Sequence, residues 1–135
     1  MEISVGQSAS RSMIVTPEIV ERYAELTGDH NPLHFDEEFA SKTRFKRLIS
    51  QGGIAVGLLH ALVAMDLPGA GTVFTEQHWN FPAPVYIGDT ITATGTITEW
   101  TVERHRGAMD FVIVNQDDVE VLTGTTGVYQ AVPKG

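Results

Sequence analysis

The sequence contains no cysteine. This absence excludes disulfide bonds, catalytic thiols and zinc sites built from cysteine ligands. A chain without cysteine is compatible with a reducing cytoplasm, which is where we expect this protein to work. The first residues also lack the basic and apolar segments of a signal peptide, so none is expected.

Long apolar runs and metal-binding motifs are missing as well. The longest apolar run, residues 54–65, contains His60 and is too short to cross a bilayer, so no membrane partner is expected. His30 and His34 are spaced like a pair of metal ligands, but Pro32 breaks the helix that such a pair needs. Because the HExxH pattern is also absent, we expect no metal.

Basic residues are scarce: 9 Lys and Arg stand against 17 Asp and Glu, for a net charge of −8. This balance argues against general nucleic-acid binding. Four of the nine basic residues nevertheless fall within positions 42–47, namely Lys42, Arg44, Lys46 and Arg47. Such a cluster on an acidic protein indicates a local anionic partner, and the alternative is a solvated helix end.

The 135 residues, 42% of them apolar, predict one globular domain over residues 1–135. Thr16 and Pro17 are typical of a helix start, and Gly28 of a helix end. Asp36 can cap a second, short helix. A third helix is expected over 52–66, and because it is apolar all round we expect it to be buried on every side.

Strand composition follows over 72–81, 90–102, 108–114 and 119–132, after a short extended segment at 12–15. Turns are expected at 88–89, 106–107 and 116–118, and such short connections predict an antiparallel sheet. A sheet wrapped around the apolar helix makes an α+β fold. One sheet cannot cover that helix completely, so we expect a homodimer, with a higher oligomer left open.

Two segments resemble a known family. Residues 23–34, YAELTGDHNPLH, resemble the hydratase motif of the MaoC-like dehydratases, which include the (R)-specific enoyl-CoA hydratases. Residues 81–89, FPAPVYIGD, are similar to a second segment of that family. The resemblance implies a hot-dog fold, in which a long antiparallel sheet wraps around a central helix, and a dimer. It also implies acyl thioester substrates, with coenzyme A as part of the substrate and no separate cofactor.

The resemblance also implies roles for single residues. Asp29 and His34 match the catalytic pair, and Gly52 matches the glycine whose backbone N–H holds the thioester oxygen. The chain departs from the family at Gln51, where histidine is often found. This departure puts the usual straight-chain enoyl-CoA substrate in doubt more than it does the reaction.

Hydration of an enoyl thioester requires a base, an acid and a group that stabilises the enolate oxygen. Asp29 and His34 can supply the first two by sharing one water, although the sequence does not show which of them moves which proton. Gly52, at the start of the apolar helix, can supply the third through free backbone N–H groups. The alternative is that these residues only form a turn, and that Gly52 and Gly53 only allow a sharp bend into the helix.

Further residues are expected to bind substrate. Asn31 shares the turn with Asp29, and Gln51 and Gly53 flank Gly52. His60 would line the substrate tunnel or support the Asp29 loop, unless it is a buried histidine with satisfied hydrogen bonds. The basic cluster would meet the phosphates of coenzyme A or the acidic surface of an acyl carrier protein. The substrate-binding candidates are Asn31, Gln51, Gly53, His60, Lys42, Arg44, Lys46 and Arg47.

We therefore expect a hydro-lyase that adds water reversibly to a 2-enoyl-CoA, giving an (R)-3-hydroxyacyl-CoA by resemblance. A hot-dog thioesterase is one alternative, but many such enzymes carry a carboxylate on the central helix, and no Asp or Glu occurs over 39–65. The other alternative is a non-catalytic acyl-CoA-binding subunit, which the Gln51 departure keeps open. The sequence leaves open the chain length and substitution of the acyl group, and the choice between coenzyme A and a carrier protein.

Overall fold

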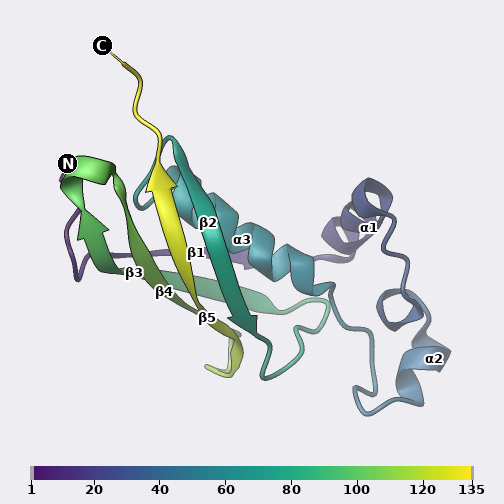
Figure 1. Cartoon of the computed structure of the whole chain (residues 1–135). Coiled ribbons are helices and arrows are strands. Elements are labelled where there is room, and N and C mark those ends of the chain that lie inside the picture. Colours follow the sequence, from purple (N-terminus) through teal and green to yellow (C-terminus); the bar gives the residue numbers. More distant parts are fainter. Residues whose placement is uncertain (1, 135) are drawn as a thin grey trace.

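A curved antiparallel sheet of five strands, with one long helix on one face, makes up most of the molecule (Figure 1). The computed structural model describes residues 2–134. The strand order is β1-β3-β4-β5-β2, and each neighbouring pair is antiparallel. The strands are β1 (Ser8–Ile14), β2 (Thr72–Asn80), β3 (Thr90–Thr101), β4 (Arg106–Val114) and β5 (Glu120–Gln130).

The helices are α1 (Pro17–Thr27), α2 (Glu37–Ser41) and α3 (Gly52–Met65), with a 3-10 turn, η1 (Pro32–His34), between α1 and α2. Their ends follow local chemistry. Thr16 Oγ1 accepts a hydrogen bond from Ile19 N–H at 3.2 Å, and Gly28 ends α1 in the left-handed conformation at φ 85°. Asp36 Oδ1 likewise accepts from Phe39 N–H at 3.0 Å and caps α2. The predicted helix boundaries are therefore confirmed.

The core lies between α3 and the concave face of the sheet. Ile91, Ala93 and Ile97 of β3 point inward against Leu59 and Leu62, which are fully buried. This burial follows from the alternation of apolar residues and threonines in β3. The predicted arrangement, a long antiparallel sheet around an apolar helix, is confirmed.

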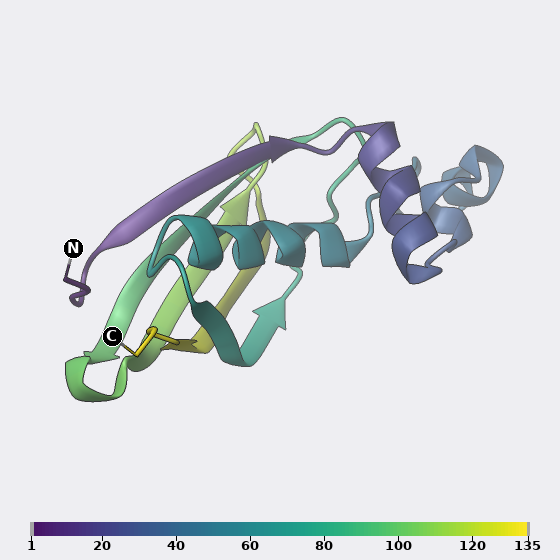
Figure 2. The ribbon, with the colours of Figure 1, turned by 90° about the horizontal axis from the view of Figure 1, so that it is seen from above.

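One side of α3 is not covered within the chain. Gly57 and His60 are exposed, and Met65 is 70% exposed, whereas the residues that face the sheet are buried. Figure 2 shows α3 lying across one face of the curved sheet. One sheet therefore covers only one side of this helix, as expected, and burial on every side remains a prediction that requires a second copy of the chain.

Several strand boundaries also differ from the prediction, most clearly at β1 and at the start of β4. β1 begins at Ser8 and not at residue 12, because its alternation is between serine and partly buried residues and gives a weak apolar signal. The reversal between β3 and β4 is a 3-10 turn over Val102–Arg104, with His105 in the left-handed region at φ 53°. The predicted turn at 106–107 already belongs to β4.

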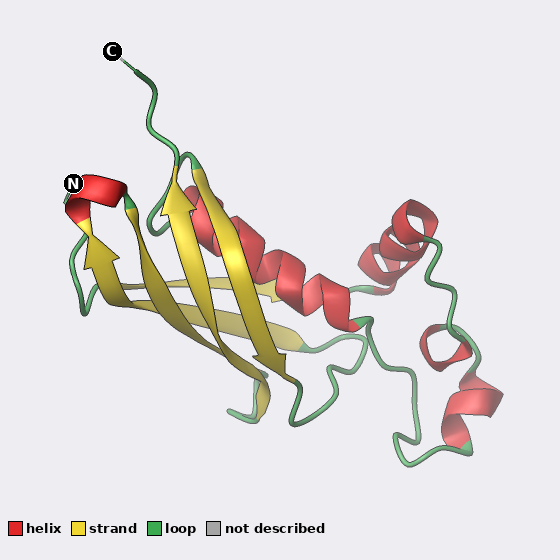
Figure 3. Cartoon of the chain, viewed as in Figure 1, coloured by secondary structure: helices red, strands yellow, loops and turns green. Residues whose placement is uncertain are grey.

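Helices α1 and α2 lie together beyond the sheet, at the end where α3 begins (Figure 3). The loops that join them therefore meet the N-terminus of α3. This arrangement brings the segment around residue 29 close to residues 49–53, although the two are some twenty residues apart in sequence.

Candidate active site

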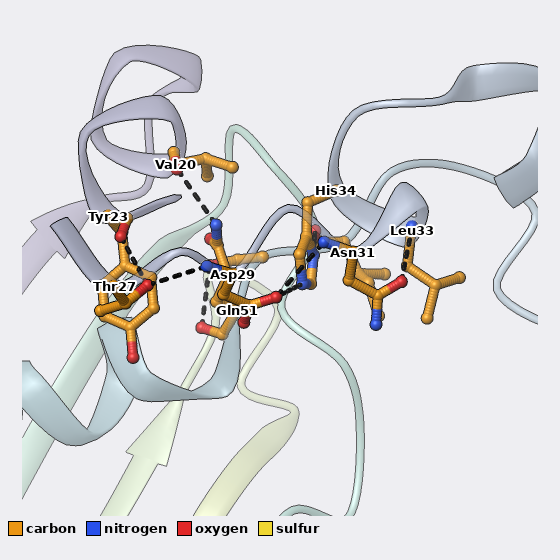
Figure 4. A network of polar contacts seen from close by, with 10 residues as sticks. Val20, Tyr23, Thr27, Asp29, Asn31, Leu33, His34 and Gln51 are labelled. Carbon is orange, nitrogen blue, oxygen red and sulfur yellow. Dashed lines mark hydrogen bonds and ion pairs between the residues drawn. The ribbon is translucent and has the colours of Figure 1, made fainter. Parts of the chain in front are cut away.

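Asp29 and His34 face each other across the loop between α1 and α2 (Figure 4). His34 is buried, and its Nδ1 lies 2.7 Å from the carbonyl oxygen of Ile49. A carbonyl oxygen only accepts hydrogen bonds, so Nδ1 carries a proton. In the neutral ring Nε2 is then an acceptor, and it faces Asp29 Oδ1 at 3.8 Å.

The backbone of the loop fixes the Asp29 side of this pair. Asp29 N–H donates to Thr27 Oγ1 at 3.2 Å, and Asn31 N–H donates to Asp29 Oδ1 at 3.3 Å. Asn31 Oδ1 accepts from Leu33 N–H at 3.0 Å and so caps the 3-10 turn that carries His34. The oxygen of Asn31 is thus used to hold the loop, while the side chain of Asp29 remains 44% exposed.

The gap between Asp29 and His34 suits a water molecule. The 3.8 Å between Nε2 and Oδ1 is too long for a direct hydrogen bond. A water or substrate hydroxyl can instead lie about 2.8 Å from each atom. Asp29 Oδ1 accepts hydrogen bonds, and so does Nε2 of a ring protonated at Nδ1, so such a water can donate one proton to each atom and turn its lone pairs outward.

Gln51 precedes α3 and is only 2% exposed. It provides no side-chain cap for the helix, so the first N–H groups of α3, beginning with that of Gly52, have no partner within the helix. Gln51 Nε2 donates to the carbonyl oxygen of Val20 in α1 at 3.0 Å. Its Oε1 is buried without a hydrogen-bond partner among the described residues, which typically costs about 1–3 kcal/mol.

The two glycines that follow have different neighbours. A Cβ on Gly52 would lie 3.3 Å from the ring of Phe81, whereas a Cβ on Gly53 would overlap the hydroxyl and ring of Tyr23. Gly53 therefore permits the close approach of α1 to α3. Tyr23 is a residue of this site that the sequence analysis missed, because its contact with Gly53 joins helices that are distant in sequence.

A cavity of about 250 Å³ lies beside the start of α3. Its wall is largely apolar, and among the described residues that line it Arg44 is the one with a charge. The lining residues are Arg44, Phe45, Ile49, Ser50, Gln51, Gly52, Ala55, Phe81, Pro82, Ala83, Pro84, Val85 and Val121.

A second cavity, of about 440 Å³, borders His34 together with His30, Glu21 and Glu25 of the loop and α1. His34 and Gly52 thus line different cavities in the single chain, and Asp29 is not among the lining residues of either cavity. The Ile49 carbonyl connects them, because it binds His34 while Ile49 itself lines the first cavity.

The basic cluster does not act as one patch. Arg44 borders the first cavity, while Arg47 stacks on Tyr86 with 3.8 Å between its Cζ and the ring centre. Lys42 is paired with Glu38 at 3.1 Å, and Lys46 adopts a positive φ of 71° near Arg47. Spacing alone could not separate these four side chains, since the chain turns sharply within the cluster.

His60 lies outside both cavities. It is exposed on the uncovered side of α3, and its ring packs edge-on against Phe74 with 4.7 Å between ring centres. Within the single chain it therefore does not contact the Asp29 loop and is not buried.

Residues 2–134 contain no group of three or more His, Cys, Asp or Glu side chains placed to hold a metal ion. Over the same residues, none of the helices has the length and apolar character needed to cross a membrane.

The comparisons with known proteins agree on one family. A MaoC like domain matches residues 2–120. The chain is 39% identical over 103 residues to an (R)-specific enoyl-CoA hydratase of Rhodospirillum rubrum, covering 76% of this chain and 72% of the relative. It is 36% identical over 123 residues to a 3-hydroxybutyryl-CoA dehydratase of Methylorubrum extorquens, covering 91% and 78%.

Among solved structures, an (R)-hydratase from A. caviae involved in PHA biosynthesis superposes with a TM-score of 0.90 at 32% identity. The match covers 96% of this chain and 98% of that one. The chain therefore belongs to the MaoC-like domain family, and the predictions of this family and of the hot-dog fold are confirmed. The predicted hydro-lyase reaction agrees with the names that these relatives carry.

Proposed function

We propose that the protein is a hydro-lyase that adds water reversibly to a 2-enoyl-CoA to give an (R)-3-hydroxyacyl-CoA. The proposal rests on one observation: His34 Nε2 lies 3.8 Å from Asp29 Oδ1, and the Ile49 carbonyl fixes the tautomer of His34. Relatives named as (R)-specific enoyl-CoA hydratase and 3-hydroxybutyryl-CoA dehydratase support both the reaction and its stereochemistry.

The reaction follows from the positions of these groups. A water held between Asp29 and His34 attacks the β-carbon of the enoyl thioester, and the electrons of the double bond move onto the thioester oxygen. The proton that leaves the water is held by the pair and is then delivered to the α-carbon. No electrons are exchanged with another molecule, so we propose that no cofactor is required beyond the coenzyme A of the substrate.

Gly52 N–H is suited to stabilise the enolate oxygen. It lies in the first turn of α3, where the backbone N–H groups lack partners within the helix and the helix dipole is positive. A donor that meets charge as it develops typically contributes about 2.7–4 kcal/mol to lowering a barrier. Gly52 also borders the first cavity, whose apolar wall suits an acyl chain.

Arg44 is the residue of the basic cluster that we propose for the anionic part of the substrate. It is exposed, and it lines the same cavity as Gly52. A guanidinium suits the phosphates of coenzyme A, or the phosphopantetheine and acidic surface of a carrier protein.

We further propose that one hot-dog domain, residues 1–135, forms a homodimer in the cytoplasm. The uncovered side of α3, with Gly57, His60 and Met65, lies next to β2, which is an edge strand beside β5 in the sheet of the described residues. Pairing of β2 with the β2 of a second copy would extend the sheet and cover α3 of both chains.

The decisive experiment is the hydration of crotonyl-CoA by the variants Asp29→Asn and His34→Ala. Each variant removes one side of the water site, and typical general acid–base contributions predict a loss of about 10²–10⁴-fold in kcat with the fold retained. Asp117→Asn and His105→Asn are controls, because both positions lie in turns whose residues line neither cavity. Full activity in Asp29→Asn or His34→Ala would contradict the proposed roles of these residues. Thiol release from saturated acyl-CoA would instead indicate a thioesterase. Acyl-CoA binding with no turnover of any enoyl chain would indicate a non-catalytic subunit.

A further inference from the structure

Gln51 links the two parts of the site. Its Nε2 donates to the carbonyl oxygen of Val20, 31 residues earlier in the sequence and inside α1. Because a carbonyl can only accept, this contact fixes which end of the amide is the nitrogen. The bond joins α1 to the residue immediately before Gly52.

Packing alone does not explain a glutamine at this position. Oε1 has no partner among the described residues, and the side chain does not cap α3. The Val20 carbonyl lies inside α1, where the helical ladder already gives it a donor. An apolar side chain of the same length would fill the space without leaving a buried acceptor unpaired.

The position of Gln51, between α1 and Gly52, explains why a glutamine is found there. On one side, α1 leads directly to Asp29: Thr27 Oγ1 donates to the Tyr23 carbonyl at 2.7 Å and accepts from Asp29 N–H at 3.2 Å. On the other side, Gln51 is followed by Gly52. A single hydrogen bond thus sets the position of α1, and with it that of Asp29, relative to the start of α3.

We propose that Gln51 is a positioning residue: its amide holds α1 against the N-terminus of α3 and so sets the distance between the Asp29–His34 pair and the Gly52 N–H. The inference rests on the proposed hydratase function, in which water and enolate oxygen must be bound at a fixed separation. The role requires a hydrogen-bond donor that reaches Val20, and an apolar side chain cannot fulfil it.

The test compares Gln51→Met with Gln51→His, and measures kcat and KM for crotonyl-CoA together with thermal unfolding. Methionine keeps the length of the side chain but removes the donor. Misplacement of catalytic groups by about 1 Å costs on the order of 10²-fold, so we expect kcat to fall by about 10–100-fold, with KM and Tm close to those of the unchanged protein. Histidine can donate a ring N–H to Val20, so we expect Gln51→His to recover most of the kcat.

Gln130→Met is the matched control. Gln130 Nε2 also donates to backbone carbonyls, those of Pro68 at 3.3 Å and Ala70 at 3.2 Å, but at the opposite end of α3. We expect its kcat to be unchanged. This control separates the general effect of losing a side-chain amide hydrogen bond from the effect of losing the one beside the proposed active site.

Two results would overturn the inference while leaving the proposed function in place. One is an unchanged kcat in Gln51→Met. The other is a parallel fall of kcat and Tm that Gln51→His does not reverse, which would indicate a purely structural role. If Gln51→Met does not fold, Gln51→Asn takes its place, because the asparagine side chain is too short to reach the Val20 carbonyl. A kcat for Gln51→Asn below that of Gln51→His supports the inference, and an equal kcat overturns it. If the unchanged, folded protein hydrates no enoyl-CoA, both proposals fail together.

Discussion

The two ends of α3 are built in opposite ways. At its C-terminal end, Asp66 and Leu67 N–H donate to the Leu62 carbonyl at 2.8 and 3.0 Å, and Gly69 N–H donates to the Val63 carbonyl at 2.9 Å. At its N-terminal end the first N–H groups lack partners within the helix, and Gln51 Oε1 is buried without a partner. The unsatisfied end is the one that borders the cavity and Gly52.

The difference shows that the unpaired polar groups of α3, which lower the stability of the fold, are at its N-terminal end. A helix end that serves stability alone satisfies its polar groups, as the C-terminal end does. Unpaired donors and acceptors at the other end are what a site for a polar transition state requires. Substitutions at the two ends should therefore affect activity and stability in different proportions.

The largest effect on assembly and activity is expected for a substitution midway along α3, on its uncovered side. Gly57→Arg adds a charged side chain at a position where a Cβ would have no neighbour within 4 Å among the described residues outside the helix's own backbone. Sedimentation velocity should then show a monomer in place of the proposed dimer. We also expect most of the hydration activity to be lost, because the side chain of Asp29 is 44% exposed when the chain is alone.

Glu103→Arg, in the 3-10 turn between β3 and β4, is the control for the added charge. It should leave both the dimer and the activity intact. A Gly57→Arg variant that remains dimeric would show that the second copy binds elsewhere.

A smaller effect is expected for Gly53→Ala, at the N-terminal end of α3. The new methyl group would overlap the ring of Tyr23, so α1 must move away from α3. We expect a loss of about 1–3 kcal/mol in the free energy of unfolding together with a reduced kcat. Chemical denaturation and steady-state kinetics measure the two quantities.

Tyr23→Leu in the Gly53→Ala background should recover part of both losses, because the smaller side chain leaves room for the methyl group. A double-mutant cycle over the two positions gives the coupling free energy. Strictly additive effects would contradict the close approach of Tyr23 to Gly53.

The smallest effect on stability and activity is expected at the C-terminal end of α3, whose polar groups are hydrogen-bonded. Arg11 Nε lies 3.1 Å from Asp66 Oδ2, and both side chains are about one-third exposed. Such partly exposed pairs contribute roughly 0–1 kcal/mol, so Arg11→Met should change Tm only slightly and leave kcat unchanged. A large loss of activity in Arg11→Met, with the fold intact, would remove the functional distinction between the two ends.

The sequence predicted the local features of the site well. The caps at Thr16, Gly28 and Asp36 depend on contacts within a few residues, and all three are found as expected. The alternation of apolar residues and threonines along β3 likewise matches which of its residues are buried. The pairing of Asp29 with His34 also lies within one short loop, and the structure brings the two together.

Contacts between distant segments could not be predicted in this way. The Ile49 carbonyl that fixes the His34 tautomer lies 15 residues away from it, and the Val20 carbonyl that binds Gln51 lies 31 residues away. The exposure of His60 depends on the side of α3 that the sheet leaves uncovered. None of these partners has a residue type or a spacing that marks it.

The sequence alone was enough to predict the helix ends, the number and order of the strands, the family and the loop that carries Asp29 and His34, because each depends on side chains close together along the chain. Only the tertiary structure decided which nitrogen of His34 faces Asp29, that Gln51 joins α1 to α3, and that Arg44 alone of the basic cluster borders the cavity with Gly52. The physical reason is that hydrogen bonds and packing between elements depend on how α1, α3 and the sheet meet, and that geometry is set by the whole core at once.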